Sequence, residues 1–198
     1  MVSIKLCKNI VATLCGLLFV ITSISSVFAA EKQGAITSDQ TGCKTILLTN
    51  KDYLPALIKA IDEAQSEIFM SIFSFKAGIH KNSYPDHILM HLAKAVKRGV
   101  NVEVILETSG RLNDELNTQN KQTGKLLEER GVNVYFDSPR TTTHTKMIVI
   151  DEKVLILGSH NFTQSALKYN NEISIMLSRP DLAKGARDYM LKIIREAK

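Results

Sequence analysis

The stretch HTKMIVIDEKVLILGSHNFT, residues 144–163, decides the fold. It contains two apolar runs separated by three charged residues, which predicts two antiparallel strands joined as a hairpin. Polar residues stand at both outer ends of this hairpin: His144, Lys146, Ser159 and Asn161. A hairpin needs none of them for its own stability, so the stretch predicts a functional site as well as a fold.

The register of the hairpin determines whether these polar side chains meet. Side chains alternate between the faces of a strand, so His144 and Lys146 share one face, about 7 Å apart. With a turn at Glu152-Lys153, Lys146 lies opposite Ser159, and His144 lies opposite Asn161. Directly opposed residues point to the same side of an antiparallel pair. We therefore expect one patch, although a shift by one residue would divide it between the two faces.

The chemistry of this patch suits a phosphate group. Lys146, Ser159 and Asn161 offer hydrogen-bond donors and one positive charge, while His144 adds a nucleophile or an acid–base group. Gly158 leaves room for close approach. Asp151 points to the opposite face, about 16 Å along the strand from Lys146, and we interpret it as a structural carboxylate that holds the turn. The alternative, a polar hairpin edge without function, leaves the whole set of side chains without a purpose.

The stretch resembles the complete HxK-x4-D-x6-GSxN motif of the phospholipase D superfamily. The segments EIFMSIFSF (67–75), AVKRGVNVEVIL (95–106) and NFTQSALKYNNEISIML (161–177) resemble the same superfamily. The resemblance covers roughly residues 45–198. It implies a metal-free phosphodiester hydrolase that needs no cofactor.

The resemblance also implies a role for each residue of the motif. His144 attacks phosphorus and forms a covalent phosphohistidine, while Lys146, Ser159 and Asn161 hold the phosphate oxygens. Glu172 matches the carboxylate that hydrogen-bonds the imidazole. In the family, Asp151 is a structural residue.

The chain contains the motif once, whereas the implied mechanism uses two histidines. None of His80, His87, His91 and His160 is followed by a lysine in the context of the motif. We therefore expect a homodimer in which two copies of His144 meet across a two-fold axis, an arrangement that the resemblance to single-motif members supports.

Helical and strand patterns alternate along the rest of the chain. Helices are expected at 52–65, 85–99, 124–131 and from 180 onward, with strands at 67–75, 100–107, 132–136 and 172–177 and a polar loop at 108–122. This order predicts an α/β fold: a mixed β-sheet flanked by helices on both faces, as in phospholipase D-like domains.

The first residues are typical of a signal peptide. Lys5 and Lys8 precede an apolar run, and small residues allow cleavage after Ala29; an uncleaved membrane anchor is the alternative. We expect a signal peptide at 1–29, a flexible lead-in at 30–44 and a catalytic domain at 45–198, in an exported protein that is periplasmic or secreted. Cleavage removes two lysines and no acids, so the net charge falls from +5 to +3. It also leaves Cys43 unpaired.

The substrate is less constrained than the reaction. The family favours phospholipid, with transient contact at a membrane surface, whereas polar loops favour a nucleic acid and hence a non-specific endonuclease. An inactive lipid- or nucleic-acid-binding module is the third alternative. Lys76, Lys81 and Arg140 are candidate substrate contacts or ordinary surface residues. His87 and His91 have a zinc-like spacing without further ligands, and we interpret them as solvated.

Overall fold

The computed structural model describes residues 36–38, 43–108 and 114–197. The predicted signal peptide lies outside these residues and stays a prediction, as does its alternative, the membrane anchor. Within the described residues, no helix has the length and hydrophobicity needed to span a bilayer.

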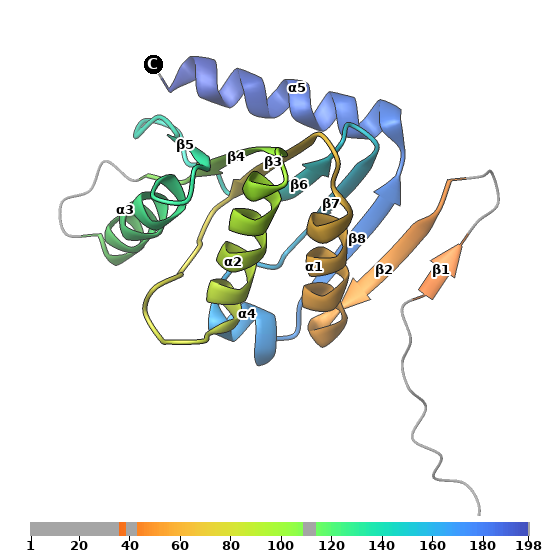
Figure 1. Cartoon of the computed structure of the whole chain (residues 1–198), viewed down its shortest axis with the longest axis horizontal. Helices are drawn as coiled ribbons and strands as arrows, with labels where there is room; N and C mark the ends of the chain where they lie inside the picture. Colours follow the sequence, from red (N-terminus) through yellow and green to blue (C-terminus); the bar gives the residue numbers. More distant parts are fainter. Residues whose placement is uncertain (1–35, 39–42, 109–113, 198) are drawn as a thin grey trace, which may run out of the picture. The chain divides into compact units, whose positions relative to one another are not determined.

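One mixed sheet of eight described strands forms the centre of the domain, in the order β1-β2-β8-β7-β6-β3-β4-β5 (Figure 1). Strands β3, β4 and β5 are mutually parallel, and every other neighbouring pair is antiparallel. The carboxyl ends of β3, β4, β5 and β7 therefore meet the starts of β6 and β8 at one edge. The strands are β1 (Ile36–Ser38), β2 (Thr45–Thr49), β3 (Glu67–Ile72), β4 (Asn101–Leu106), β5 (Asn133–Phe136), β6 (Lys146–Ile150), β7 (Val154–Gly158) and β8 (Ile173–Ser178).

Helices cover both faces of the sheet, which confirms the predicted fold class. On one face α1 (Tyr53–Glu63), α2 (Tyr84–Lys97), α3 (Glu115–Glu128) and α4 (Gln164–Lys168) contribute to the larger core, and on the other α5 (Pro180–Glu196) packs a smaller one. A 3-10 turn, η1 (Asn50–Asp52), precedes α1.

The alternation of β3 explains the two cores. Its side chains Ile68, Met70 and Ile72 face the larger core, while Phe69 faces α5. Burying each such side chain contributes roughly 1.5–3 kcal/mol to the stability of the fold.

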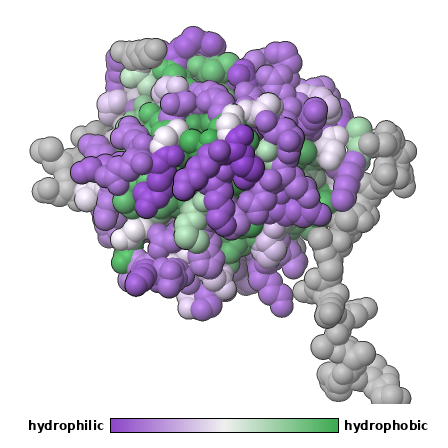
Figure 2. Space-filling model, viewed as in Figure 1, coloured by the Kyte–Doolittle hydropathy of each residue, from purple (hydrophilic) through white to green (hydrophobic). Residues whose placement is uncertain are grey.

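The side chains visible in the view of Figure 2 are mostly hydrophilic, with apolar ones in small areas.

Three local predictions are wrong. The expected loop at 108–122 contains the first half of α3, because the Asp114 side chain accepts a hydrogen bond from the Leu116 N–H and caps the helix. Two buried polar residues of α3, Asn120 and Thr123, interrupt the apolar spacing that would have revealed it. The lead-in contributes β1, which pairs with the unpredicted strand β2.

The third correction concerns the hairpin. Ile150 pairs with Val154 and Met147 with Leu157, so the turn has three residues and the expected pairing of Lys146 with Ser159 is wrong by one residue. Asp151 and Glu152 both have φ of 52°, the left-handed region that asparagine and aspartate tolerate best. This conformation makes the longer turn possible.

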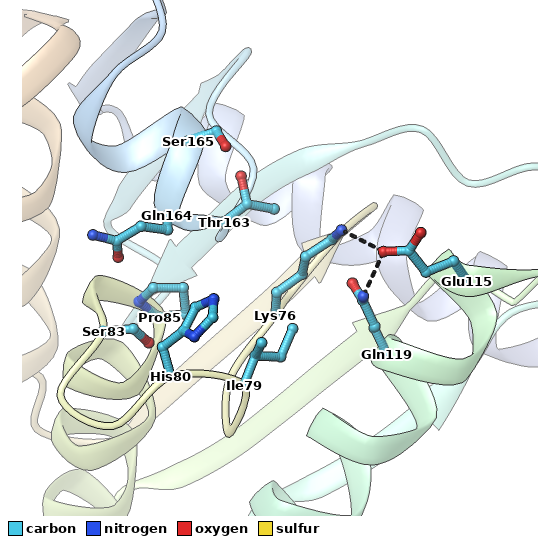
Figure 3. Close-up of a pocket in the computed structure, with 10 residues that line it drawn as sticks. All are labelled: Lys76, Ile79, His80, Ser83, Pro85, Glu115, Gln119, Thr163, Gln164 and Ser165. Atoms are coloured by element: carbon cyan, nitrogen blue, oxygen red, sulfur yellow. Dashed lines mark hydrogen bonds and ion pairs between the residues drawn. The ribbon is translucent and has the colours of Figure 1, made fainter.

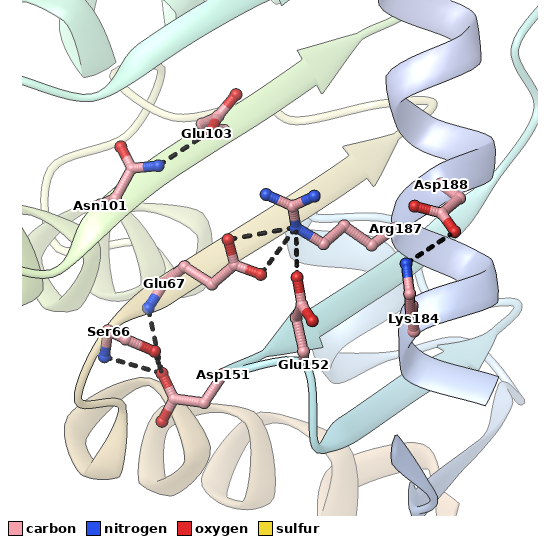
Figure 4. A network of polar contacts seen from close by, with 9 residues as sticks. All are labelled: Ser66, Glu67, Asn101, Glu103, Asp151, Glu152, Lys184, Arg187 and Asp188. Atoms are coloured by element: carbon pink, nitrogen blue, oxygen red, sulfur yellow. Dashed lines mark hydrogen bonds and ion pairs between the residues drawn. The ribbon is translucent and has the colours of Figure 1, made fainter. Parts of the chain in front are cut away.

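Asp151 connects this turn to the start of β3. Its Oδ1 accepts hydrogen bonds from the backbone N–H of Ser66 (2.8 Å) and Glu67 (3.0 Å) and from the Ser66 hydroxyl (2.8 Å). Its Oδ2 accepts one from the Gln65 N–H (3.0 Å). Figure 4 shows the carboxylate turned toward residues 66 and 67.

Arg187 ties the same region to α5. Its Nε lies 2.8 Å from Glu67 Oε1 and 3.2 Å from Glu152 Oε1, so one guanidinium joins β3, the turn and the helix (Figure 4).

The hydrogen bonds from residues 65–67 also change the pKa of Asp151. Partial burial alone would raise this pKa, but the hydrogen bonds outweigh the burial and lower it. The contribution of Asp151 to the stability of the fold is therefore complete at pH values above its ordinary pKa of 3.8. It is lost as the pH falls through the lowered pKa of the folded protein.

Asp151→Asn should lower the free energy of unfolding by about 1–3 kcal/mol, because charge-assisted bonds to three backbone donors are weakened. Urea denaturation at neutral pH measures this loss. Asp188→Asn, on the exposed side of α5, is the control and should change the free energy by less than about 0.5 kcal/mol. Equal effects of the two substitutions would contradict the structural role of Asp151.

Candidate active site

The site lies at the sheet edge where β3 ends and β6 begins. The Phe73 N–H donates to the Thr145 carbonyl (2.9 Å), which extends the β3–β6 ladder beyond both strands. The Phe73 ring then contacts His144 edge-on at 4.4 Å and lies 4.7 Å from Lys146 Nζ. One aromatic ring therefore positions the two side chains that the sequence places two residues apart.

Lys146 is buried, whereas His144 is exposed. Its ammonium donates to the His144 carbonyl at 3.0 Å. Burial lowers the pKa of Lys146, while the negative charge of Glu172 acts in the opposite direction. The lysine thus supplies a partly desolvated positive charge at the backbone of His144.

Ser159 and Glu172 meet where β7 ends and β8 begins. The Ser159 N–H donates to the Ile173 carbonyl (2.9 Å), and the Ile173 N–H donates to Ser159 Oγ (3.0 Å). The Ser159 hydroxyl donates to the Glu172 carboxylate, which also accepts from Asn170 Nδ2 (3.0 Å). Within the described residues, the Glu172 carboxylate accepts from Ser159 and Asn170 and makes no hydrogen bond with His144, contrary to the expectation.

Gly158 is required by the close approach of β8. A Cβ atom at this position would lie 2.2 Å from Ser174 Oγ and 2.4 Å from the Ile173 carbonyl oxygen. The space left by the missing side chain of Gly158 is therefore filled by β8. This close approach of β8 places Ser159 within hydrogen-bond distance of Glu172.

Asn161 follows β7 and lies beside the end of β3, because the Phe162 N–H donates to the Ser74 carbonyl (2.9 Å). Asn161 Oδ1 and Ser74 Oγ are buried without a hydrogen-bond partner in the described part of the chain. Buried polar atoms are rarely left unpaired in native proteins, and sites that await a ligand or water are among the exceptions.

His160 points away from the site. It is fully buried, stacks on Tyr53 with ring centroids 4.0 Å apart, and contacts Ser174 Oγ and the Asn50 carbonyl. Burial lowers the pKa of His160, partly offset by the Asn50 contact and Glu172, which favours the neutral ring. This histidine is a core residue despite its place inside the motif.

Two surface cavities flank the strand ends. A cavity of 430 Å³ is lined by His144 together with Arg140, Lys192 and Tyr189. A second cavity, of 320 Å³, is lined by Lys76 and His80 (Figure 3), and Lys76 pairs there with Glu115 at 3.6 Å. Of the three candidate substrate contacts, Arg140 therefore shares a cavity with His144, Lys76 lies in the other cavity with its charge paired, and Lys81 lines neither.

The zinc-like histidine pair is accounted for by other contacts. His91 Nδ1 lies 2.7 Å from Asp62 Oδ1, and the His87 ring lies against Tyr84 with centroids 6.1 Å apart. In the described ranges, no three His, Cys, Asp or Glu side chains gather as a metal site would require.

Sequence reasoning missed several residues of this edge. Glu107 and Asp137 directly follow the parallel strands β4 and β5, and both are buried. Asn120 of α3 donates to the carbonyls of Phe73 (2.8 Å) and Glu107 (2.9 Å), joining two strand ends. Polar residues at the carboxyl ends of neighbouring parallel strands were the available signal.

Comparisons with known proteins show the family of the chain. The model of the family described as "Cardiolipin synthase, PLD-like domain" matches residues 57–194. The chain is 31% identical over 130 residues to a phospholipase D of Rickettsia prowazekii, covering 65% of this chain and 56% of the relative. It is 28% identical over 159 residues to the mitochondrial cardiolipin hydrolase of Mus musculus, covering 78% and 64%. The chain thus spans less than two thirds of either relative.

Solved structures show the same fold. A phospholipase D family member, Nuc from Salmonella typhimurium, superposes with a TM-score of 0.67 at 23% identity, over 79% of this chain and 97% of that one. NucT from Helicobacter pylori gives 0.61 at 22% identity, over 78% and 97%.

Gly158→Ala should destabilise the protein by about 1–3 kcal/mol, because the new methyl group collides with the backbone of β8. Thermal or urea unfolding measures this change. Gly185→Ala on α5 is the matched control, since a Cβ atom there meets nothing within 4 Å, and it should be neutral or stabilise by about 0.5–1 kcal/mol. A Gly158→Ala protein as stable as the wild type would show that β8 does not require the glycine.

Proposed function

The chain belongs to the phospholipase D superfamily, and from this premise we propose that it hydrolyses phosphodiesters through His144. The observation that carries the proposal is that this exposed imidazole and the ammonium of the buried Lys146 contact the same ring, that of Phe73. An attacking group and a positive charge for the developing phosphate charge are therefore held by one side chain.

In the proposed first step, an imidazole nitrogen of His144 attacks phosphorus, so that a P–N bond forms as the P–O bond to the leaving group breaks. A second histidine gives its proton to the leaving oxygen. In the second step that histidine takes a proton from water, whose oxygen attacks phosphorus and releases His144. Lys146, Ser159 and Asn161 bind the phosphate oxygens in both steps, and the scheme uses no metal ion.

Glu172 has a proposed role that changes when phosphate binds. Its carboxylate now accepts the Ser159 hydroxyl. When that hydroxyl donates to phosphate, the carboxylate loses this partner and becomes available to the imidazole N–H. A carboxylate in that position fixes the tautomer of the attacking ring.

We propose that the second histidine is His144 of a second copy of the chain, because the sequence contains one motif. Two apolar side chains next to Ser159, Leu157 and Ile173, are 39% and 54% exposed and suit contact with such a copy. A two-fold interface brings the same patch of each subunit together.

Phospholipid is the first candidate substrate, because the relatives named phospholipase D and cardiolipin hydrolase align over most of the described domain. A nucleic acid is the second. The cavity that His144 lines contains Arg140 and several threonine residues, which suit a polyanion, and also Lys192, whose charge is paired with Glu196 at 3.6 Å. For either substrate, export remains the expectation set by the N-terminal sequence.

His144→Asn should lower phosphodiesterase activity by at least about 10³-fold, because it removes the nucleophile. We would test phosphatidylcholine vesicles, cardiolipin vesicles, plasmid DNA and bis-p-nitrophenyl phosphate, all in EDTA, and measure choline, phosphatidate, nicked DNA and nitrophenol. His87→Asn on α2 is the control and should retain activity. Undiminished activity of His144→Asn would overturn the assignment, and turnover of lipid or of DNA would identify the substrate class.

Mixing wild-type and His144→Asn chains tests the shared site. After the chains are refolded together, activity should fall with the square of the wild-type fraction, because only dimers with two His144 side chains can react. Sedimentation of the same samples reports the oligomeric state. A linear decrease, or full activity of a monomer, would show that one chain is sufficient.

A further inference from the structure

A pair of buried carboxyl groups lies directly behind the segment that carries His144. Glu107 follows β4 and Asp137 follows β5, and each is only 3% exposed. The Thr143 N–H donates to Glu107 Oε2 (2.6 Å) and to Asp137 Oδ2 (3.1 Å). One backbone donor, next to the proposed nucleophile, is therefore held by two acids from neighbouring strands.

We propose that Glu107 and Asp137 share one proton and that this protonated pair positions His144, as a pH-dependent support of the phosphodiesterase site. This inference rests on the proposed function. The two are positioning residues, because they act on His144 through the Thr143 backbone and do not contact the reacting groups.

The geometry favours a shared proton. Glu107 Oε2 and Asp137 Oδ2 accept the same Thr143 N–H, so the two buried carboxyl groups lie close together, where two anions would repel each other. Asp137 Oδ1 accepts the Thr108 N–H (2.6 Å) and Oδ2 accepts the Thr143 N–H (3.1 Å), so both of its oxygens are acceptors, and we place the shared proton on Glu107. Burial, with further contributions from Asp137 and Asp114, raises the pKa of Glu107 to about 7.

The surroundings oppose a second negative charge. Among the described residues, the charged groups that act on Glu107 are acids: Asp137 from the end of β5 and Asp114 from the start of α3. Of the contacts from the described residues, the one with the Thr143 N–H acts in the opposite direction and lowers the pKa of Glu107, because an N–H donor favours the ionised carboxylate. Above about pH 7 the two carboxylates repel each other and move apart, so they can no longer share the Thr143 N–H, and the position of Thr143 and His144 is less fixed.

The sign of the stability effect follows from the raised pKa. The pair stabilises the folded protein fully below the ordinary glutamate value of 4.5, and this contribution is lost as the pH rises to about 7. Activity should follow the titration of the folded state, with a decrease in kcat as the pH passes about 7 and little change in KM.

Glu107→Gln is the decisive variant. Its amide oxygen can accept from Thr143 and its NH₂ group can donate to Asp137, so it imitates the protonated pair at every pH. We expect its kcat to exceed that of the wild type several-fold at about pH 8.5, with similar values at about pH 6. Glu128→Gln, on the exposed side of α3, should keep the wild-type profile.

Superimposable profiles of Glu107→Gln and an active wild type would overturn the inference and leave the proposed function intact. An inactive wild type would instead contradict the proposed function. In either case the Thr143 amide resonance tests the pair without any substrate: it should titrate near pH 7 in the wild-type protein and not in Glu107→Gln. If Glu107→Gln does not fold, Asp137→Asn replaces it, and a wild-type Thr143 resonance that does not titrate near pH 7 would overturn the inference.

Discussion

The hydrogen bonds from the backbone of residues 65–67 to Asp151 are the contact on which the rest of the structure depends. They fix the turn after β6 against the start of β3. Because β6 is antiparallel to β3, fixing one end also fixes the other, where Ile72 pairs with Lys146. A shift by one residue would send the Lys146 side chain to the opposite face of the sheet. Asp151, the aspartate of the motif, therefore acts on the site from the opposite end of β6.

The fold was predictable because its signals are local. Apolar runs such as EIFMSI and NVEVIL are typical of buried strands, and the helical spacing of Leu57 and Ile61 is typical of a helix on a core. Two residues on the buried face of α3, Asn120 and Thr123, are polar. Asn120 bonds the segments that follow β3 and β4, and Thr123 bonds the segment that follows β3. Polarity there reflects tertiary contacts, which no periodicity of the sequence reveals.

The motif supplied the candidate residues of the site, His144, Lys146, Ser159 and Asn161, but not their geometry. The hairpin pairing that was expected to unite them is wrong by one residue, because the turn contains two left-handed residues. The side chains are instead brought to the same sheet edge by the chain beyond the strand ends, where Ser159 leaves β7 and bonds to the start of β8. Glu107 and Asp137 are buried where β4 and β5 end, and they share the Thr143 N–H as a hydrogen-bond donor. This contact joins residues far apart in the sequence, so the sequence pattern does not reveal it.

The most direct measurement is the mass of the covalent intermediate. Wild-type protein mixed with bis-p-nitrophenyl phosphate, quenched within a turnover in alkaline denaturant and digested, should carry one p-nitrophenyl phosphoryl group on the peptide that contains His144. The adduct should disappear as product is released. An adduct on another residue, or turnover without any adduct, would contradict the central claim that His144 attacks phosphorus.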